Sequence, residues 1–136
     1  MDTTMVTEFL SANHRAVLAT TRARGDAQLS PVLAVADDAG RVLISTRETA
    51  VKTRNLRRAP RASLCVMPDA FFGGWMQITG PVDIVSLPEA MDLLVDYYRR
   101  AAGEHANWDD YRSAMTREKR CILVLTPEEV GPTISG

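Results

Sequence analysis

The residues whose types and spacing could do chemistry lie mostly in the segment 45–58, where hydroxyl and cationic side chains follow an apolar run. The pattern predicts a strand that ends near Ser45 and Thr46, followed after a short turn by a helix. The unpaired N–H groups of a helix start attract anions. Cations such as Lys52 and Arg54 oppose the helix dipole there unless a negative group offsets them. The segment therefore indicates a phosphate site, with a solvated basic face as the alternative.

A second group of candidates follows the glycine pair at residues 73–74. Trp75 is either a core residue or one wall of a cofactor-ring site, to which Gln77 could supply a hydrogen bond. His14 and His105 have no second metal ligand at a suitable spacing, so no metal site is expected. The sequence carries no GxSxG, HExxH, Walker or GxGxxG pattern, so no catalytic residue is assigned.

Composition narrows the class of protein. The chain has 136 residues and a formal net charge of −1, which suits one domain over 1–136 and gives no global attraction to nucleic acid. No apolar run reaches the roughly 20 residues of a membrane-spanning helix, and the start lacks the pattern of a secretory signal. We therefore expect a cytoplasmic protein that binds neither nucleic acid nor membranes, with Cys65 and Cys121 as buried apolar residues.

Periodicity and turn residues predict a mainly β protein in which helices flank about six antiparallel strands. Strands are expected over 16–21, 27–36, 41–46, 62–67, 75–85 and 121–125, and helices over 4–12, 50–58, 90–102 and 107–119. The second and third strands should form a hairpin, and a small barrel would leave few exposed edges. Pro31 cannot donate a ladder hydrogen bond, so it predicts an edge, a bulge or a ligand-facing gap. Thr49 is expected to cap the second helix, a Ser86–Glu89 capping box the third, and Gly80 to bend the long strand. Gly103 should end the third helix, and the fourth should start at Asn107, with Asp109 and Asp110 in its first turn.

Several strings of the sequence resemble one known family. They are Ala16–Thr21, Gln28–Val32, Lys52–Ser63, Tyr98–His105 and Trp108–Arg112. In this order they are similar to the pyridoxamine 5′-phosphate oxidase-like superfamily and, more narrowly, to its actinobacterial branch that uses the deazaflavin coenzyme F420. The resemblance covers the chain from about residue 16 to residue 130.

The resemblance implies a split β-barrel and a homodimer with two cofactor sites at the interface between subunits. At each site Lys52 would contact the cofactor phosphate, assisted by three polar neighbours: Ser45, Thr46 and Asn55. Two further sets would line the cofactor ring: the backbone of Ser30, Pro31 and Val32, and the side chains of Trp75 and Gln77, from the same or the partner subunit.

The choice of cofactor depends on a departure from the family pattern. Flavin-binding oxidases of the superfamily usually carry Ser-Arg-Lys where this chain has Ala50-Val51-Lys52, which counts against FMN and against pyridoxamine phosphate as substrate. The acidic tail of F420 needs an extended basic track, for which four arginines are available: Arg54, Arg57, Arg58 and Arg61. The expected function is hydride transfer between F420 and an unsaturated, apolar or aromatic small molecule. The alternatives are an FMN-dependent flavin reductase or oxidase and a non-catalytic protein that binds a cofactor or tetrapyrrole.

Overall fold

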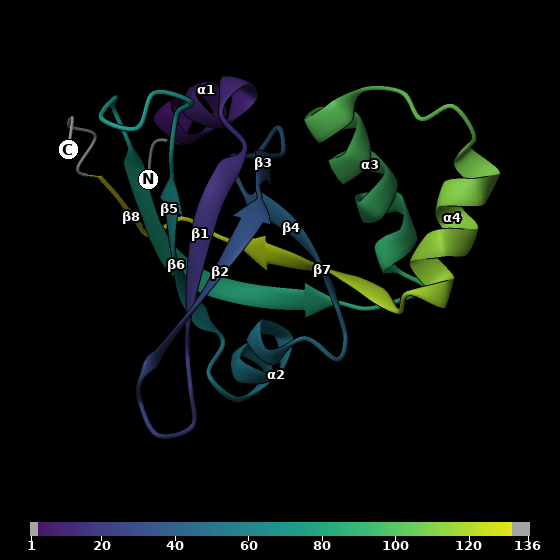
Figure 1. The fold of residues 1–136 in the computed structure, drawn as a ribbon, viewed down its shortest axis with the longest axis horizontal. Helices are drawn as coiled ribbons and strands as arrows, with labels where there is room; N and C mark the ends of the chain where they lie inside the picture. Colours follow the sequence, from purple (N-terminus) through teal and green to yellow (C-terminus); the bar gives the residue numbers. More distant parts are fainter. Residues whose placement is uncertain (1–2, 132–136) are drawn as a thin grey trace.

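Alternating apolar and polar residues build eight strands in the part of the chain that the computed structural model describes, residues 3–131. The strands are β1 (Arg15–Thr21), β2 (Ala27–Leu33), β3 (Val35–Ala36), β4 (Val42–Arg47), β5 (Arg61–Val66), β6 (Met76–Val85), β7 (Arg120–Leu125) and β8 (Glu129–Val130). They pair in the order β2-β1-β5-β6-β7-β4-β3, with β8 also on β6, and every pairing is antiparallel (Figure 1). The predicted mainly antiparallel half-barrel is confirmed.

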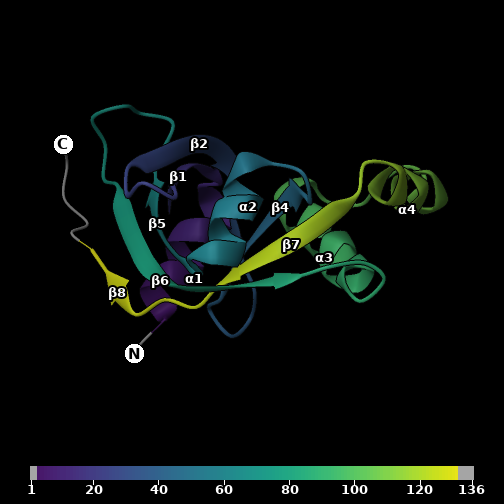
Figure 2. The same cartoon turned by 90° about the horizontal axis from the view of Figure 1, so that it is seen from below.

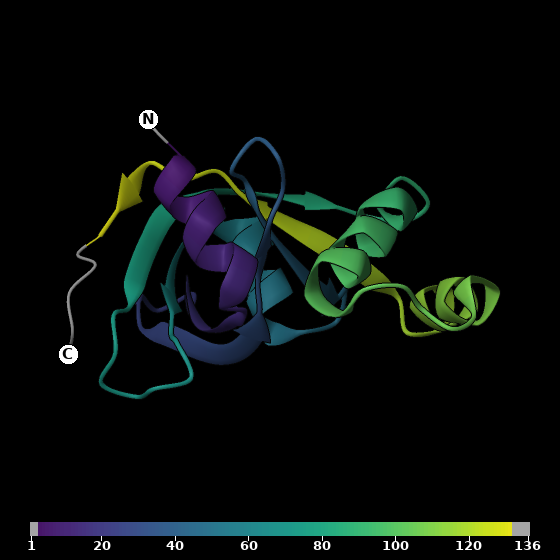
Figure 3. The ribbon, with the colours of Figure 1, turned by 90° about the horizontal axis from the view of Figure 1, so that it is seen from above.

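Four helices lie outside these strands: α1 (Thr4–Ala12), α2 (Val51–Arg58), α3 (Ala90–Ala102) and α4 (Trp108–Arg117). Helix α2 packs on β1 and β6, whereas α3 packs on β3, β4 and β7 and carries α4 beside it. Figure 2 shows α3 and α4 together at one end of the molecule, and Figure 3 shows α1 lying over the strands. Among the described residues, no helix has both the length and the apolar content that crossing a bilayer requires.

Two hydrophobic cores explain why the first half of β4 and nearly all of β7 are apolar without a break. Along β4, Ile44 faces the core inside the half-barrel while Leu43 faces a second core beneath α3 and α4. In β7, Leu123 and Ile122 divide between the two cores in the same way. Successive side chains of a strand point to opposite faces, so a strand covered on both faces needs an unbroken apolar run.

The strand β6 changes partner midway along its length. Its first half pairs with β5 up to Pro81, and its second half pairs with β7 from Val82 onward. At the changeover the carbonyl oxygen of Thr126 comes so close to Gly80 that a Cβ there would lie 1.9 Å away from it. The N–H of Thr126 donates to Pro81 at 3.0 Å. Gly80 is therefore the point at which the two halves of the sheet meet.

The expected hairpin between residues 27–36 and 41–46 is only partly correct. The chain leaves the first strand at Ala34, whose N–H donates to the carbonyl of His14 at 2.8 Å. As a result β2 pairs with β1, and only the two residues of β3 pair with β4. Pro31 lies in β2 at the end of the strand order, so the prediction of an edge position is confirmed.

Two of the predicted helix caps are wrong, and two other helix-end signals are confirmed. Ala50 occupies the N-cap of α2 in place of Thr49, and no side chain caps it. No capping box forms at α3, because the hydroxyl of Ser86 donates to the carboxylate of Glu48 at 2.9 Å instead. In contrast, Asn107 caps α4 by accepting from the N–H of Asp110. The positive φ of Gly103, 83°, ends α3 as predicted.

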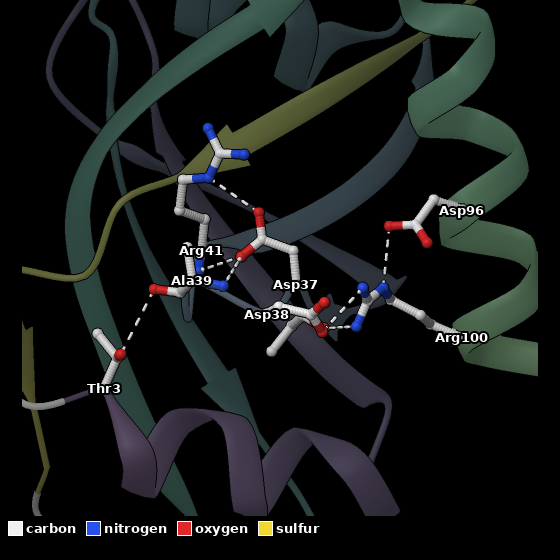
Figure 4. A network of polar contacts seen from close by, with 8 residues as sticks. Thr3, Asp37, Asp38, Ala39, Arg41, Asp96 and Arg100 are labelled. Atoms are coloured by element: carbon white, nitrogen blue, oxygen red, sulfur yellow. Dashed lines mark hydrogen bonds and ion pairs between the residues drawn. The ribbon is translucent and has the colours of Figure 1, made fainter.

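A polar network fixes α3 against the turn between β3 and β4 (Figure 4). Asp37 closes the turn by accepting from the backbone N–H and the guanidinium of Arg41 at 2.9 and 2.8 Å. Arg100 of α3 donates to the carboxylates of Asp96 and Asp38 and to the carbonyl of Ala36. These hydrogen bonds of Arg100 fix the position of α3. The preceding turn of the helix, which contains Tyr97, approaches the open side of the half-barrel.

Candidate functional site

The open side of the half-barrel lies between β2 and β4. In the described part of the chain β2 pairs only with β1, and β4 pairs with β3 only at Val42 and Leu43. Each strand therefore leaves an unpaired edge, and the two edges approach each other. A pocket of about 510 Å³ occupies this gap, lined by Pro31, Val32, Leu33, Ser45, Thr46, Arg47, Thr49, Ala50, Lys52 and Arg120.

The pocket brings together five of the residues predicted to bind a cofactor. They come from β2, β4 and α2 and are Pro31, Val32, Ser45, Thr46 and Lys52. The topology explains this convergence, because the edge of β2, the end of β4 and the start of α2 all border the same gap. The prediction that the residues around Lys52 form one site with those around Pro31 is thus matched by their placement.

Lys52 is the most unusual charged group of the pocket. Its side chain is half-buried, and burial lowers the pKa of its ammonium, with Arg120 adding to the effect. Within residues 3–131 the ammonium forms no hydrogen bond and no ion pair. A buried cation without a counter-charge is unfavourable. An anion bound in the pocket would supply the missing partner.

Two arginines that sequence reasoning missed add to the positive charge. Arg47 and Arg120 lie directly opposite each other in the β4–β7 ladder. Both contact the carboxylate of Glu118, at 3.4 Å from Arg47 and 2.9 Å from Arg120. The hydrogen bond from Arg120 lowers the pKa of Glu118. Glu118 thus contacts two of the three cations, whereas the pocket lining itself contains Arg47, Lys52 and Arg120 and no carboxylate, so the pocket keeps a net positive charge.

The start of α2 reinforces this charge. No side chain caps its N-terminus, and no carboxylate lies in its first turn. Thr53 holds this end in place because its hydroxyl donates to the carbonyl of Arg47 at 2.7 Å. The start of α2 therefore has a fixed position next to Thr49 and Ala50, which line the pocket. Its unpaired N–H groups are fixed with it. Helix starts of this kind bind phosphate, so the residues present fit a phosphate-bearing ligand.

The other five predicted residues do not line the pocket. Ser30 and Asn55 are buried beneath it, where each takes part in a side-chain hydrogen bond. Arg54 is exposed on α2, and in the described chain no other residue contacts its guanidinium. Trp75 is half-buried and Gln77 exposed near the start of β6. Within one subunit, neither reaches the gap between β2 and β4.

Most of the arginines predicted to form a basic track along α2 form hydrogen bonds or ion pairs with other residues of the chain. Arg57 forms an ion pair with Glu48, and Arg61 forms one with Glu128 at 2.7 Å. Arg58 donates to the carbonyl of Thr21. Of the four arginines proposed for the track, only Arg54 has no such partner among residues 3–131.

Tyr97 is another residue that sequence reasoning missed, since its spacing marks it only as part of a helix stripe. Its hydroxyl donates to the carbonyl of Leu33 at 2.9 Å, so α3 is tied to the unpaired edge of β2. Burial raises the pKa of Tyr97, and the backbone of Ser45 and the charge of Arg120 oppose the shift. The phenol therefore stays a hydrogen-bond donor at neutral pH, at the rim of the pocket.

The two cysteines are free in the structure. Cys121 is buried beside the pocket, and burial raises the pKa of its thiol to about 11. A thiol with a raised pKa is a poor nucleophile at neutral pH, so the prediction of an apolar role is confirmed for Cys121. Cys65 is only half-buried, on the outward face of β5, which corrects the expectation of full burial.

An antiparallel half-barrel with a cationic pocket at its open side is the architecture of the split-barrel class of proteins. The family model that describes pyridoxamine 5′-phosphate oxidase matches residues 3–133. The chain therefore belongs to the pyridoxamine 5′-phosphate oxidase family, and the superfamily suggested by the resemblance is confirmed.

Solved structures share this fold over nearly the whole chain. A conserved hypothetical protein from Mycobacterium tuberculosis is 22% identical, with a TM-score of 0.77 over 96% of this chain and 82% of that one. An F420 reductase is 21% identical, with a TM-score of 0.70 over 91% and 94%. A pyridoxamine 5′-phosphate oxidase-related, FMN-binding protein from Nostoc punctiforme is 14% identical, with a TM-score of 0.63 over 94% and 78%. These similarities show the common fold.

Proposed function

We propose that the protein is an oxidoreductase that binds the deazaflavin coenzyme F420 and transfers a hydride between it and an unsaturated small molecule. One observation carries the proposal: the half-buried ammonium of Lys52 has no counter-charge among residues 3–131 and lies beside the uncapped start of α2. The family supports a cofactor of the flavin type, and the fold is similar to that of an F420 reductase.

In this proposal the chain binds and orients the cofactor, which supplies the hydride chemistry. Lys52, Arg47 and Arg120 hold the phosphoryl group at the start of α2. The unpaired strand edges at Pro31 and Ser45 offer backbone groups to the polar side of a planar ring. Because Pro31 has no N–H, this position offers only its carbonyl, which suits a ring atom that donates a hydrogen bond.

FMN is the second candidate, because the family includes FMN-binding proteins with this fold. Val51, at the position where the superfamily's flavin oxidases usually carry arginine, is 42% exposed and adds no charge to the pocket. We expect calorimetric titration to give a Kd for F420 at least about tenfold below that for FMN, equivalent to about 1.4 kcal/mol. Oxidation of reduced F420 by a panel of unsaturated ketones and quinones should follow. A lower Kd for FMN, or binding of F420 without turnover, would contradict the proposal.

We also propose that a second copy of the chain covers the outward face of β2. Leu29 and Leu33 are 63% and 51% exposed there. A further pocket of about 380 Å³ continues from the first across β2, and most of its lining is apolar: Arg15, Ala16, Val17, Pro31, Val32, Leu33 and Met67. Exposed apolar surface of this kind marks protein interfaces. In a homodimer Trp75 and Gln77 would approach the cofactor from the partner subunit.

Replacing Leu29 with glutamate is expected to convert this homodimer into monomers, because it buries an unpaired charge in the interface. Sedimentation equilibrium measures the change in mass. The matched control is Met5→Glu on α1, where a comparably exposed apolar side chain (50%) is replaced. Equal masses for the wild-type chain and Leu29→Glu, whether both are monomeric or both dimeric, would show that this face is not the interface.

A further inference from the structure

Helix α2 buries polar side chains where a helix normally buries apolar ones. Its three buried residues are Thr53, Asn55 and Leu56, of which the first two are 0% and 5% exposed. Burying an amide or a hydroxyl is unfavourable unless its hydrogen bonds are satisfied. The buried polar side chains of Thr53 and Asn55 therefore indicate that α2 must take a defined position, at some expense of stability.

Asn55 begins a chain of side-chain hydrogen bonds that runs from α2 through β1 to β2. Its amide donates to the hydroxyl of Thr20 at 3.1 Å. Thr20 donates to the amide oxygen of Gln28 at 3.1 Å, and the amide of Gln28 donates to the hydroxyl of Ser30 at 2.8 Å. Thr20 is 2% and Ser30 is 8% exposed, whereas Gln28 between them is half-buried.

The two ends of this chain lie next to the two walls of the pocket. Asn55 is one helical turn after Lys52, and Ser30 directly precedes Pro31, which lines the pocket with Val32. Within residues 3–131, no backbone hydrogen bond joins α2 to β2. The side-chain bridge through Thr20 thus connects the cationic wall to the β2 wall, while Arg58 adds a second contact from α2 to β1 by donating to the carbonyl of Thr21 and to the amide oxygen of Asn55.

We propose that Asn55, Thr20 and Gln28 are positioning residues, which hold the β2 wall at a fixed distance from the Lys52 wall. The inference rests on the proposed function, in which one ligand has its phosphoryl group at Lys52 and its ring at Pro31. Such a ligand must satisfy both walls at once, so a pre-set spacing removes an ordering cost from binding. Fully satisfied buried networks provide rigidity of this kind.

The proposal separates a ligand that contacts both walls from one that contacts only the cationic wall. In Asn55→Leu an apolar side chain of similar size replaces the buried amide, and the loss of one buried partner lowers stability, while Thr20 keeps its bond to Gln28. We expect its affinity for F420 to fall about tenfold. Its affinity for inorganic phosphate, which contacts only the cationic wall, should stay within about twofold of the wild-type value. Isothermal titration measures the first value, and phosphorus NMR titration measures the second.

Thr20→Val removes the middle of the same chain and serves if Asn55→Leu does not fold. The double variant should lose no more F420 affinity than either single variant, because members of one network are not additive. Thr116→Val is the control, since its hydroxyl bonds to its own helix at Arg112 and Thr116 does not line the pocket. This control should bind F420 and phosphate like the wild-type chain.

Three results would overturn the inference. Unchanged F420 affinity in both Asn55→Leu and Thr20→Val would remove the positioning role while leaving the proposed function intact. Equal losses of F420 and phosphate affinity together with a lower Tm would show that the chain only supports the fold. Failure of the wild-type protein to bind either F420 or FMN would refute the proposed function, and the positioning role would fall with it.

Discussion

Lys52→Met is expected to weaken F420 binding by about 1.5–3 kcal/mol, or about 10- to 150-fold in Kd, the range for a hydrogen bond to a charged group. Methionine keeps much of the apolar stem of lysine but removes the ammonium, so the loss reports on the charge. Binding is measured by isothermal titration. Arg112→Gln is the matched control, because it removes a cation from the exposed face of α4, away from the pocket. Equal affinity of Lys52→Met and the wild-type protein would refute the phosphate site.

The same substitution is expected to stabilise the ligand-free protein slightly. The pKa of Lys52 is lowered by burial and by Arg120, which means that the folded state holds this proton less tightly than the unfolded state. Between the lowered pKa and the ordinary one, the unfolded state binds more protons, so the free energy of unfolding rises with pH through that window. Below the window the charged Lys52 lowers stability in full. Urea unfolding at neutral pH should therefore give a higher free energy of unfolding for Lys52→Met than for the wild type.

This opposition between stability and binding is typical of a functional site. Arg47 and Arg120 also lower the stability of the fold, because like charges directly opposite each other in a sheet repel. Glu118 relieves part of this repulsion by contacting both guanidinium groups. A bound phosphoryl group would relieve the remainder.

The ends of a helix were predicted correctly where a few neighbouring residues determine them. Asn107 with its following aspartates predicted the start of α4, and Gly103 predicted the end of α3. The predicted cap at Thr49 failed because α2 begins one residue later, with Ala50 at its N-cap, and the capping box at Ser86 failed because a tertiary contact overrode the local pattern. Ser86 bonds Glu48, which is distant in sequence and is also held by Arg57. No local pattern contains that information.

The candidate site was predictable as far as it depends on one segment of the chain. Lys52, Ser45 and Thr46 follow from a strand that runs into a helix. Arg120 and Tyr97 could not be found, because they reach the pocket only through the pairing of β7 with β4 and the packing of α3. Other residues assigned to the ligand do not line the pocket, and their part in binding stays a prediction.

Ser30 is one of these residues. It was grouped with Pro31 and Val32 for its backbone groups, because the three are consecutive in the sequence. In the structure Ser30 is 8% exposed and its hydroxyl accepts from Gln28, away from the pocket. The sequence shows that the faces alternate, but only the pairing of β2 with β1 shows which of them faces inward.

Gly80→Ala is expected to destabilise the fold by about 3 kcal/mol or more, the upper part of the range for overpacking. The added Cβ would lie 1.9 Å from the carbonyl oxygen of Thr126, a backbone atom that cannot turn aside as a side chain can. The N–H of the same residue donates to Pro81, and the carbonyl of Thr79 accepts from Glu128, so the segment is held on both sides of the contact. The added Cβ can therefore be accommodated only if the backbone segment after β7 shifts away from it.

Gly74→Ala is the matched control for this prediction. It makes the same chemical change in the loop before β6, where a Cβ would meet no atom within 4 Å. This variant should be neutral or more stable by about 0.4–1 kcal/mol through the unfolded state. Thermal unfolding should place the Tm of Gly80→Ala about 10 °C below that of Gly74→Ala. Equal Tm values would mean that β6 tolerates a side chain where its partner changes from β5 to β7. Gly80 would then not be needed to hold the two halves of the sheet, or Arg120 in β7, in their present arrangement.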